Sequence, residues 1–101
     1  MNIKQIAKKL RDKLKKYDDF IGLYVYGSRI AGNYKKDSDL DIIAVFEKEP
    51  EYEKSLEISG DVNDIEAESD IFIDFHAMTE DELNLNFIFF NEVKKGLFYA
   101  V

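Results

Sequence analysis

Residues 26–41 read YGSRIAGNYKKDSDLD and connect two short apolar runs, FIGLYVY at residues 20–26 and DLDIIAVF at residues 39–46. Both runs are rich in β-branched and aromatic residues, and Gly27 ends the first of them, so they predict two buried β-strands. The connection therefore places a Gly-Ser turn after one strand and two aspartates, one residue apart, at the start of the next. This arrangement calls for a chemical explanation.

The two aspartates, Asp39 and Asp41, are spaced so that their side chains project from the same face of a strand. Two like charges side by side are unfavourable unless a cation lies between them. Mg²⁺ binds carboxylate oxygens together with substrate phosphates, so the pair is a candidate metal site. The alternative is that both are strand-entry residues that face solvent, because aspartate is common at such positions.

The Gly27-Ser28 pair favours the first interpretation. A glycine directly after a strand permits a tight turn and lets a phosphate approach the backbone, where the Ser28 hydroxyl and the following N–H groups can donate to it. Arg29 can add a planar cation. Such a turn alone can be no more than a turn. Together with aspartates that return to the same sheet edge, it supplies the phosphate donors and metal ligands that phosphoryl chemistry requires.

The flanking sequence predicts the other elements. Apolar residues recur every three or four positions in residues 2–17, which predicts an amphipathic helix. Residues 47–70 hold ten acidic side chains against two lysines, and we expect a solvated helix or loop, or both, broken at Ser59-Gly60. Residues 71–76, IFIDFH, predict a third strand.

A capping box formed by Thr79 and Glu82 predicts the start of one further helix, which should end at Lys94-Lys95-Gly96. The closing residues LFYAV predict a short strand or extended tail. This order predicts one α/β (α+β) domain over residues 1–101, with a small mixed sheet and helices packed mainly on one face.

Composition excludes several classes of function. The chain of 101 residues has no cysteine, which excludes a disulfide framework, a thiolate nucleophile and a cysteine zinc site. Its formal net charge of -7 argues against general nucleic-acid binding, which needs a basic face. The lysine-rich first segment is neither a secretory signal nor a membrane span, so we expect a cytoplasmic protein.

Residues 27–41 resemble the G-S-x10-D-x-D signature of the DNA polymerase β-like nucleotidyltransferase superfamily, in its minimal (MNT) form. The fuller GSRxxG…SDxD pattern is matched by Gly27, Ser28, Arg29, Gly32, Ser38, Asp39 and Asp41. The resemblance extends to Asp74 in the third strand, to the capped helix and to the stretch KGLFY. It departs at Ile30-Ala31, where many relatives have Ala-Arg, so one cation near the nucleotide phosphates is missing and Arg29 would have to compensate.

The resemblance implies a role for each residue. Asp39, Asp41 and Asp74 would be catalytic and would hold one or two Mg²⁺ ions, and Asp74 would help deprotonate the attacking hydroxyl. Gly27, Ser28, Arg29 and Ser38 would bind the nucleotide. Asp70 is the alternative to Asp74, which we prefer because it interrupts an apolar run. His76 would lie on the same face as Asp74, either as a substrate or metal contact or as a solvent contact.

The implied reaction moves a nucleoside monophosphate, AMP from ATP, to a hydroxyl group. The resemblance points to the MNT partner of HEPN-domain toxins, which would transfer AMP to a toxin tyrosine as an antitoxin. The acidic charge fits a protein acceptor better than RNA. Two alternatives stay open: a non-catalytic antitoxin that acts by contact, and a nucleotidyltransferase for RNA or a small molecule. Aromatic residues beyond the needs of the core in residues 87–99 would indicate a surface for a partner or a second copy.

Overall fold

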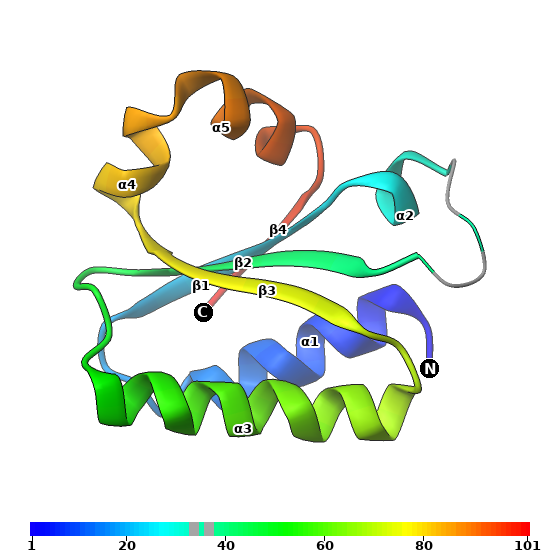
Figure 1. The fold of residues 1–101 in the computed structure, drawn as a ribbon, viewed down its shortest axis with the longest axis horizontal. Helices are drawn as coiled ribbons and strands as arrows, with labels where there is room; N and C mark the ends of the chain where they lie inside the picture. The colour runs from blue at the N-terminus through cyan, green and yellow to red at the C-terminus, as the bar shows by residue number, and fades with distance from the viewer. Residues whose placement is uncertain (33–34, 36–37) are drawn as a thin grey trace.

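The computed structural model describes residues 1–32, 35 and 38–101, and it has an α+β fold. The described elements follow one another as α1 (Ile3–Leu14), β1 (Phe20–Tyr26), α2 (Ser28–Ala31), β2 (Leu40–Phe46), α3 (Tyr52–Ser69), β3 (Ile73–Thr79), α4 (Glu80–Leu85), α5 (Phe87–Lys94) and β4 (Leu97–Ala100) (Figure 1). The predicted fold class is confirmed.

The sheet is mixed and has the strand order β3-β2-β1-β4. Strand β1 is antiparallel to both of its neighbours, β2 and β4, whereas β2 and β3 are parallel. Parallel neighbours need a long crossover, and α3 provides it between β2 and β3. Because β2 and β3 run in the same direction, their first residues lie side by side at the same end of the sheet.

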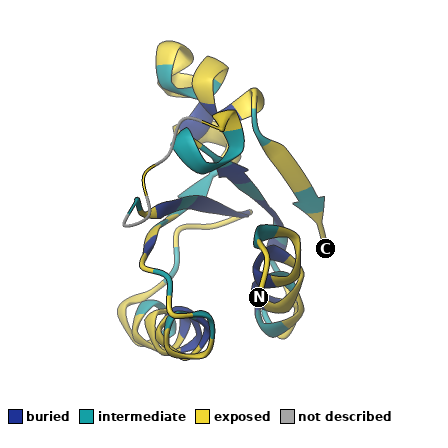
Figure 2. Cartoon of the chain, turned by 90° about the vertical axis from the view of Figure 1, so that its right-hand side faces the viewer, coloured by how far each residue is buried: buried dark blue, intermediate teal, exposed yellow. Residues whose placement is uncertain are grey.

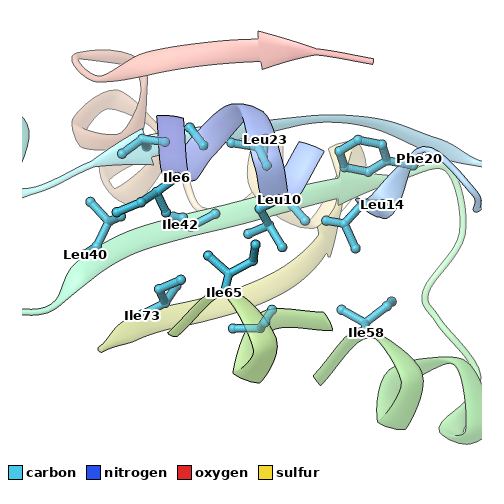
Figure 3. Close-up of a cluster of buried hydrophobic side chains, with 14 of the residues drawn as sticks. Ile6, Leu10, Leu14, Phe20, Leu23, Leu40, Ile42, Ile58, Ile65 and Ile73 are labelled. Atoms are coloured by element: carbon cyan, nitrogen blue, oxygen red, sulfur yellow. The ribbon is translucent and has the colours of Figure 1, made fainter. Parts of the chain in front are cut away.

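Helices α1 and α3 cover one face of the sheet, and the short helices α4 and α5 lie over the other (Figure 1). The main core lies between the sheet and the two long helices (Figure 3); its buried members include Ile6, Leu10, Leu14, Leu23, Leu40, Ile42, Ile58, Ile65 and Ile73. A smaller cluster on the second face joins Ile43, Val45, Leu83 and Val93. Figure 2 shows that α4, α5 and β4 are largely exposed. Within the described residues, no helix is long and apolar enough to cross a membrane.

Helix α3 corrects one prediction. We expected a break at Ser59-Gly60, but the helix runs without interruption from Tyr52 to Ser69. Ile58, Val62 and Ile65 are buried on one stripe of this helix. Their burial outweighs the cost of a glycine in a helix interior, which is about 1 kcal/mol. Most of the acidic segment is therefore a solvated helix, and residues 47–51 lie outside it.

The C-terminal helix corrects another prediction. We expected one helix from Thr79 to the Lys94-Lys95-Gly96 end, and the structure has two, α4 and α5, separated at Asn86. The capping box of Thr79 and Glu82 is present at the start of α4. Asn86 then caps α5, because its side-chain oxygen accepts from the Phe89 N–H at 3.3 Å. Asparagine is a strong N-cap residue, and here its capping starts a new helix.

Candidate active site

Three side chains form a row across the sheet at the end where β1 stops. Asp41 of β2 lies opposite Asp74 of β3 in the parallel register, and Tyr26 of β1 lies opposite Asp41 in the antiparallel register. The residues next to the acids, Leu40, Ile42 and Ile73, belong to the main core. Because side chains alternate along a strand, Asp41 and Asp74 point to the other face of the sheet, the one that carries α4 and α5.

The charges in this row affect one another. Burial raises the pKa of Asp41, and the carboxylates of Asp74 and Asp39 raise it further, while His76 lowers it. Burial and then the charges of Asp41 and Asp74 raise the pKa of Tyr26 to about 12. The Tyr26 phenol is therefore neutral at physiological pH. Two neighbouring carboxylates repel each other, and a cation bound between them reduces this repulsion.

The structure distinguishes the predicted acids by position. Asp74, and not Asp70, faces Asp41, because Asp70 ends α3 in a left-handed conformation with φ of 57°. Asp39 lies one residue before β2 and is exposed, yet its charge reaches Asp41. Asp41 and Asp74 thus form the centre of the site, with Asp39 at its edge.

His76 lies beside Asp74, as its spacing on the strand predicts. Its Nε2 is 3.2 Å from the Asp74 Oδ1 atom, and about half of each side chain is exposed to solvent. The imidazole can therefore hold one orientation of the Asp74 carboxylate. It also remains accessible to a bound molecule.

Gly27 lets the turn lie directly against Asp41. Its φ of 86° and ψ of −161° belong to a region that is essentially restricted to glycine. A Cβ atom at this position would overlap the Asp41 carboxylate. The Gly27 carbonyl accepts the N–H groups of Ile30 and Ala31 at 3.1 and 3.0 Å, which starts the single turn of α2. Ser28 follows Gly27 and is half-buried.

Arg29 and Ser38, both predicted to bind nucleotide, contact each other across the connection. The Arg29 Nε donates to the Ser38 carbonyl at 2.7 Å. The Ser38 hydroxyl accepts the Lys35 N–H at 2.9 Å. The first of these bonds joins Ser38 to Arg29 of α2. In this structure the two residues are thus bonded to each other directly before Asp39.

The donor set of the site suits Mg²⁺. Among the described residues, no three acidic or histidine side chains converge closely enough to enclose a metal ion. Mg²⁺ does not need such a cage, since it commonly binds through one or two carboxylates and takes its other ligands from water and substrate phosphates. Asp41 and Asp74 can provide these two carboxylates.

A hollow of about 490 Å³ lies beside the Gly27 turn, lined by Gly27, Ser28, Ile30, Ala31, Glu92, Lys95 and Gly96. The sequence pattern indicates neither Lys95 nor Tyr26 as a site residue. Tyr26 could have been found, because it precedes Gly27 and ends the strand. Lys95 could not, because its sequence context is that of an ordinary cation at a helix C-terminus.

Comparison with known proteins identifies the family. The family described as "Polymerase beta, Nucleotidyltransferase" matches residues 8–98. The chain belongs to the polymerase β nucleotidyltransferase family. This membership agrees with the sequence resemblance at the superfamily level.

Solved structures share the fold. A protein of Sulfolobus solfataricus, assigned as a nucleotidyltransferase, is 22% identical with a TM-score of 0.62 over 94% of this chain and 77% of its own. A toxin-antitoxin structure with AMP-PNP is 19% identical with a TM-score of 0.63 over 99% of this chain and 72% of its own. A second protein assigned as a nucleotidyltransferase is 25% identical, with a TM-score of 0.51 over 98% and 92%. No curated protein matches the chain.

Proposed function

We propose that this chain is an Mg²⁺-dependent nucleotidyltransferase that transfers AMP from ATP to a hydroxyl group of a partner protein. The observation that carries this proposal is the pair of Asp41 and Asp74, in register on adjacent strands and directly beside the Gly27-Ser28 turn. Family membership supports the same reaction class.

In this proposal each residue acts on a defined part of the reaction. The acceptor oxygen forms a bond to the α-phosphorus, the bond between that phosphorus and the bridging oxygen breaks, and pyrophosphate leaves. The Ser28 hydroxyl and the backbone at Gly27 bind the β- and γ-phosphates. Asp39, Asp41 and Asp74 would hold one or two Mg²⁺ ions, which would neutralise charge on the phosphates. Asp74 also accepts the proton of the attacking hydroxyl.

The partner in this proposal is a HEPN-type toxin, modified on a tyrosine. The net charge of -7 disfavours an RNA acceptor and is compatible with a protein. Leu85, Phe87 and Ile88 are each more than 70% exposed around the junction of α4 and α5, which gives the chain an apolar surface typical of protein interaction sites. The structural likeness to the toxin-antitoxin complex is consistent with such a partner.

A contact-only antitoxin is the second candidate, and the same apolar surface favours it. The two functions differ in what they require of the acids. A protein that acts only by contact has no need for Asp41 and Asp74 side by side in a half-buried row. The carboxylate pair therefore favours the enzyme.

Label transfer tests the proposed function. Purified protein, Mg²⁺ and α-labelled ATP are added to a lysate of the source cells, and the products are separated on a gel. The Asp39→Asn, Asp41→Asn double variant is run beside the wild type. The control is Glu53→Gln with Asp64→Asn, which removes the same charge from exposed positions on α3, on the opposite face of the sheet.

The proposal expects a discrete labelled protein band with the wild type and the α3 control, and no band with the site variant. Label in an RNase-sensitive species would contradict the protein acceptor and support RNA as the acceptor. No transfer to a co-purified partner known to be bound would contradict the enzyme and favour the contact-only antitoxin.

A further inference from the structure

The end of α5 lies next to the proposed phosphate turn. Strand β4 pairs with β1 so that Leu97 lies opposite Val25. The ladder ends there, and Lys95, two residues before Leu97, is the helical C-cap of α5 and lies near Gly27. The hollow confirms the proximity, because Lys95 and Gly96 line it together with Gly27 and Ser28. A cation from a distant part of the sequence is thus brought to the turn.

Gly96 fixes this arrangement. A Cβ atom here would overlap the Val25 carbonyl oxygen and lie 2.9 Å from the Tyr26 Cα. Its N–H also donates to the Val93 carbonyl at 3.0 Å. The backbone next to Lys95 is therefore held against the last residues of β1, beside the hollow that Lys95 and Gly27 both line.

Lys95 forms a weak ion pair with Glu92. Its Nζ is 2.9 Å from the Glu92 Oε1, and both side chains are more than 60% exposed. An exposed pair three residues apart on one helix stabilises a protein by less than about 1 kcal/mol. A triphosphate offers this ammonium several charged oxygens in place of one carboxylate. Phosphate oxygens can therefore compete with Glu92 for the ammonium of Lys95.

The negative charge of the site makes a further cation useful for binding phosphates. Asp39, Asp41 and Asp74 all carry negative charge toward the place where a nucleotide would bind, and they repel its phosphates. The Arg29 Nε donates to the Ser38 carbonyl. A further cation at the turn would offset the acids where the phosphates lie.

We propose that Lys95 binds the β- and γ-phosphates of the nucleotide and leaves Glu92 to do so. This inference rests on the proposed function, since it assigns a phosphate-binding residue to the same site. Lys95 is a binding residue in this account. Glu92 competes with the phosphates for it and so weakens nucleotide binding.

The test is equilibrium binding to the full chain in the presence of Mg²⁺, with ATP, AMP and inorganic tripolyphosphate as the three probes. The variants are Lys95→Ala, Lys95→Arg and Glu92→Gln. Lys94→Ala is the matched control: it removes the same charge from the same helix end, but Lys94 lies over the Phe90 ring at 4.9 Å and does not line the hollow. Thermal unfolding of each variant checks its fold.

Lys95→Ala should weaken binding of ATP and tripolyphosphate by about tenfold, the usual effect of losing one charge-assisted hydrogen bond, and leave AMP binding unchanged. Lys95→Arg should retain most of the affinity. Glu92→Gln should tighten ATP binding, and Lys94→Ala should change it by less than about twofold, because exposed charges are screened.

Equal losses in Lys95→Ala and Lys94→Ala would overturn the inference, because they would reflect net charge alone. Equal weakening of AMP and ATP in Lys95→Ala would overturn it as well. A wild type that binds ATP, with Lys95→Ala binding equally well, contradicts only the role of Lys95. A wild type that binds neither ATP nor tripolyphosphate contradicts this inference and the proposed function together.

Discussion

Gly27 allows the backbone turn to lie directly against the Asp41 carboxylate. The residue adopts a conformation that only glycine takes readily, and its missing side chain leaves room for the Asp41 carboxylate. The sequence predicted that glycine was needed for a tight turn. The sequence alone could not predict the contact with Asp41, because that contact depends on how β1 and β2 are paired in register.

Replacement of Gly27 by alanine should therefore be costly for stability. The strained backbone alone costs about 1–3 kcal/mol, and the overlap with Asp41 adds to it. Gly32→Ala is the control, since Gly32 also has a positive φ, of 85°, but a Cβ added there would meet no atom of the described residues within 4 Å. Urea unfolding should show a larger loss for Gly27→Ala than for Gly32→Ala. Equal losses would show that Asp41 does not press against the turn.

Elements were predictable where the signal was local or periodic. The apolar spacing of α1, the short apolar runs of β1, β2 and β3, and the capping box of α4 were all readable from the sequence. Two helix breaks were not. Ser59-Gly60 was interpreted as a break although core contacts keep α3 continuous, and Asn86 was passed over although its side chain starts α5. In both places a specific contact, core packing in α3 and side-chain capping at Asn86, outweighed the local preference of the sequence.

Gly60→Ala should stabilise the protein. Gly60 lies in the middle of α3 with open space around it, so alanine gains about 0.5–1 kcal/mol from helix propensity. Gly22→Ala should have the opposite effect, because a Cβ in β1 would lie 2.8 Å from the Tyr99 carbonyl oxygen. Thermal unfolding of the two variants measures both signs. A loss of stability in Gly60→Ala would contradict the continuous, solvent-facing helix.

The turn between α1 and β1 should make stability depend on pH. Burial tends to raise the pKa of Asp19, but the hydrogen bonds from Lys54 and from the Lys48 N–H outweigh it, so the pKa lies below its usual value. A lowered carboxyl pKa stabilises the fold above the unfolded value of about 4, and this contribution disappears as the pH falls through the folded pKa.

Asp19→Asn should therefore be less stable than the wild type at pH 7, by about 1 kcal/mol, and the difference should shrink below pH of about 4. The control is Asp18→Asn, an exposed neighbour whose replacement should change stability little at either pH. Urea unfolding at both pH values gives the comparison. A difference that is constant with pH would contradict the charge contribution of Asp19.

At the scale of the whole molecule, the two faces of the sheet have different roles. The long helices and the main core stabilise one face of the sheet, while the other face carries the acids and the short helices. The motif, the third carboxylate and the fold class could be predicted from the sequence. The row with Tyr26 and the approach of Lys95 could not, because they require the strand order β3-β2-β1-β4.

The net charge of -7 predicts weak affinity for nucleic acid. Non-specific binding depends on neutralising phosphates with basic side chains, so single-stranded RNA should bind with a Kd weaker than about 10⁻⁴ M at physiological salt. Fluorescence anisotropy with a labelled oligonucleotide measures it. Micromolar affinity that falls steeply with salt would favour an RNA acceptor instead.

Asp39, Asp41 and Asp74 beside the Gly27 turn should bind a metal–nucleotide complex, and calorimetric titration of ATP with Mg²⁺ tests this most directly. We expect the wild type to bind and the Asp39→Asn, Asp41→Asn variant to lose binding. Because the substitution removes repulsion between carboxylates, the unliganded variant should unfold at the same or a higher temperature. Unchanged nucleotide binding by a folded double variant would contradict the assignment of these acids to the site.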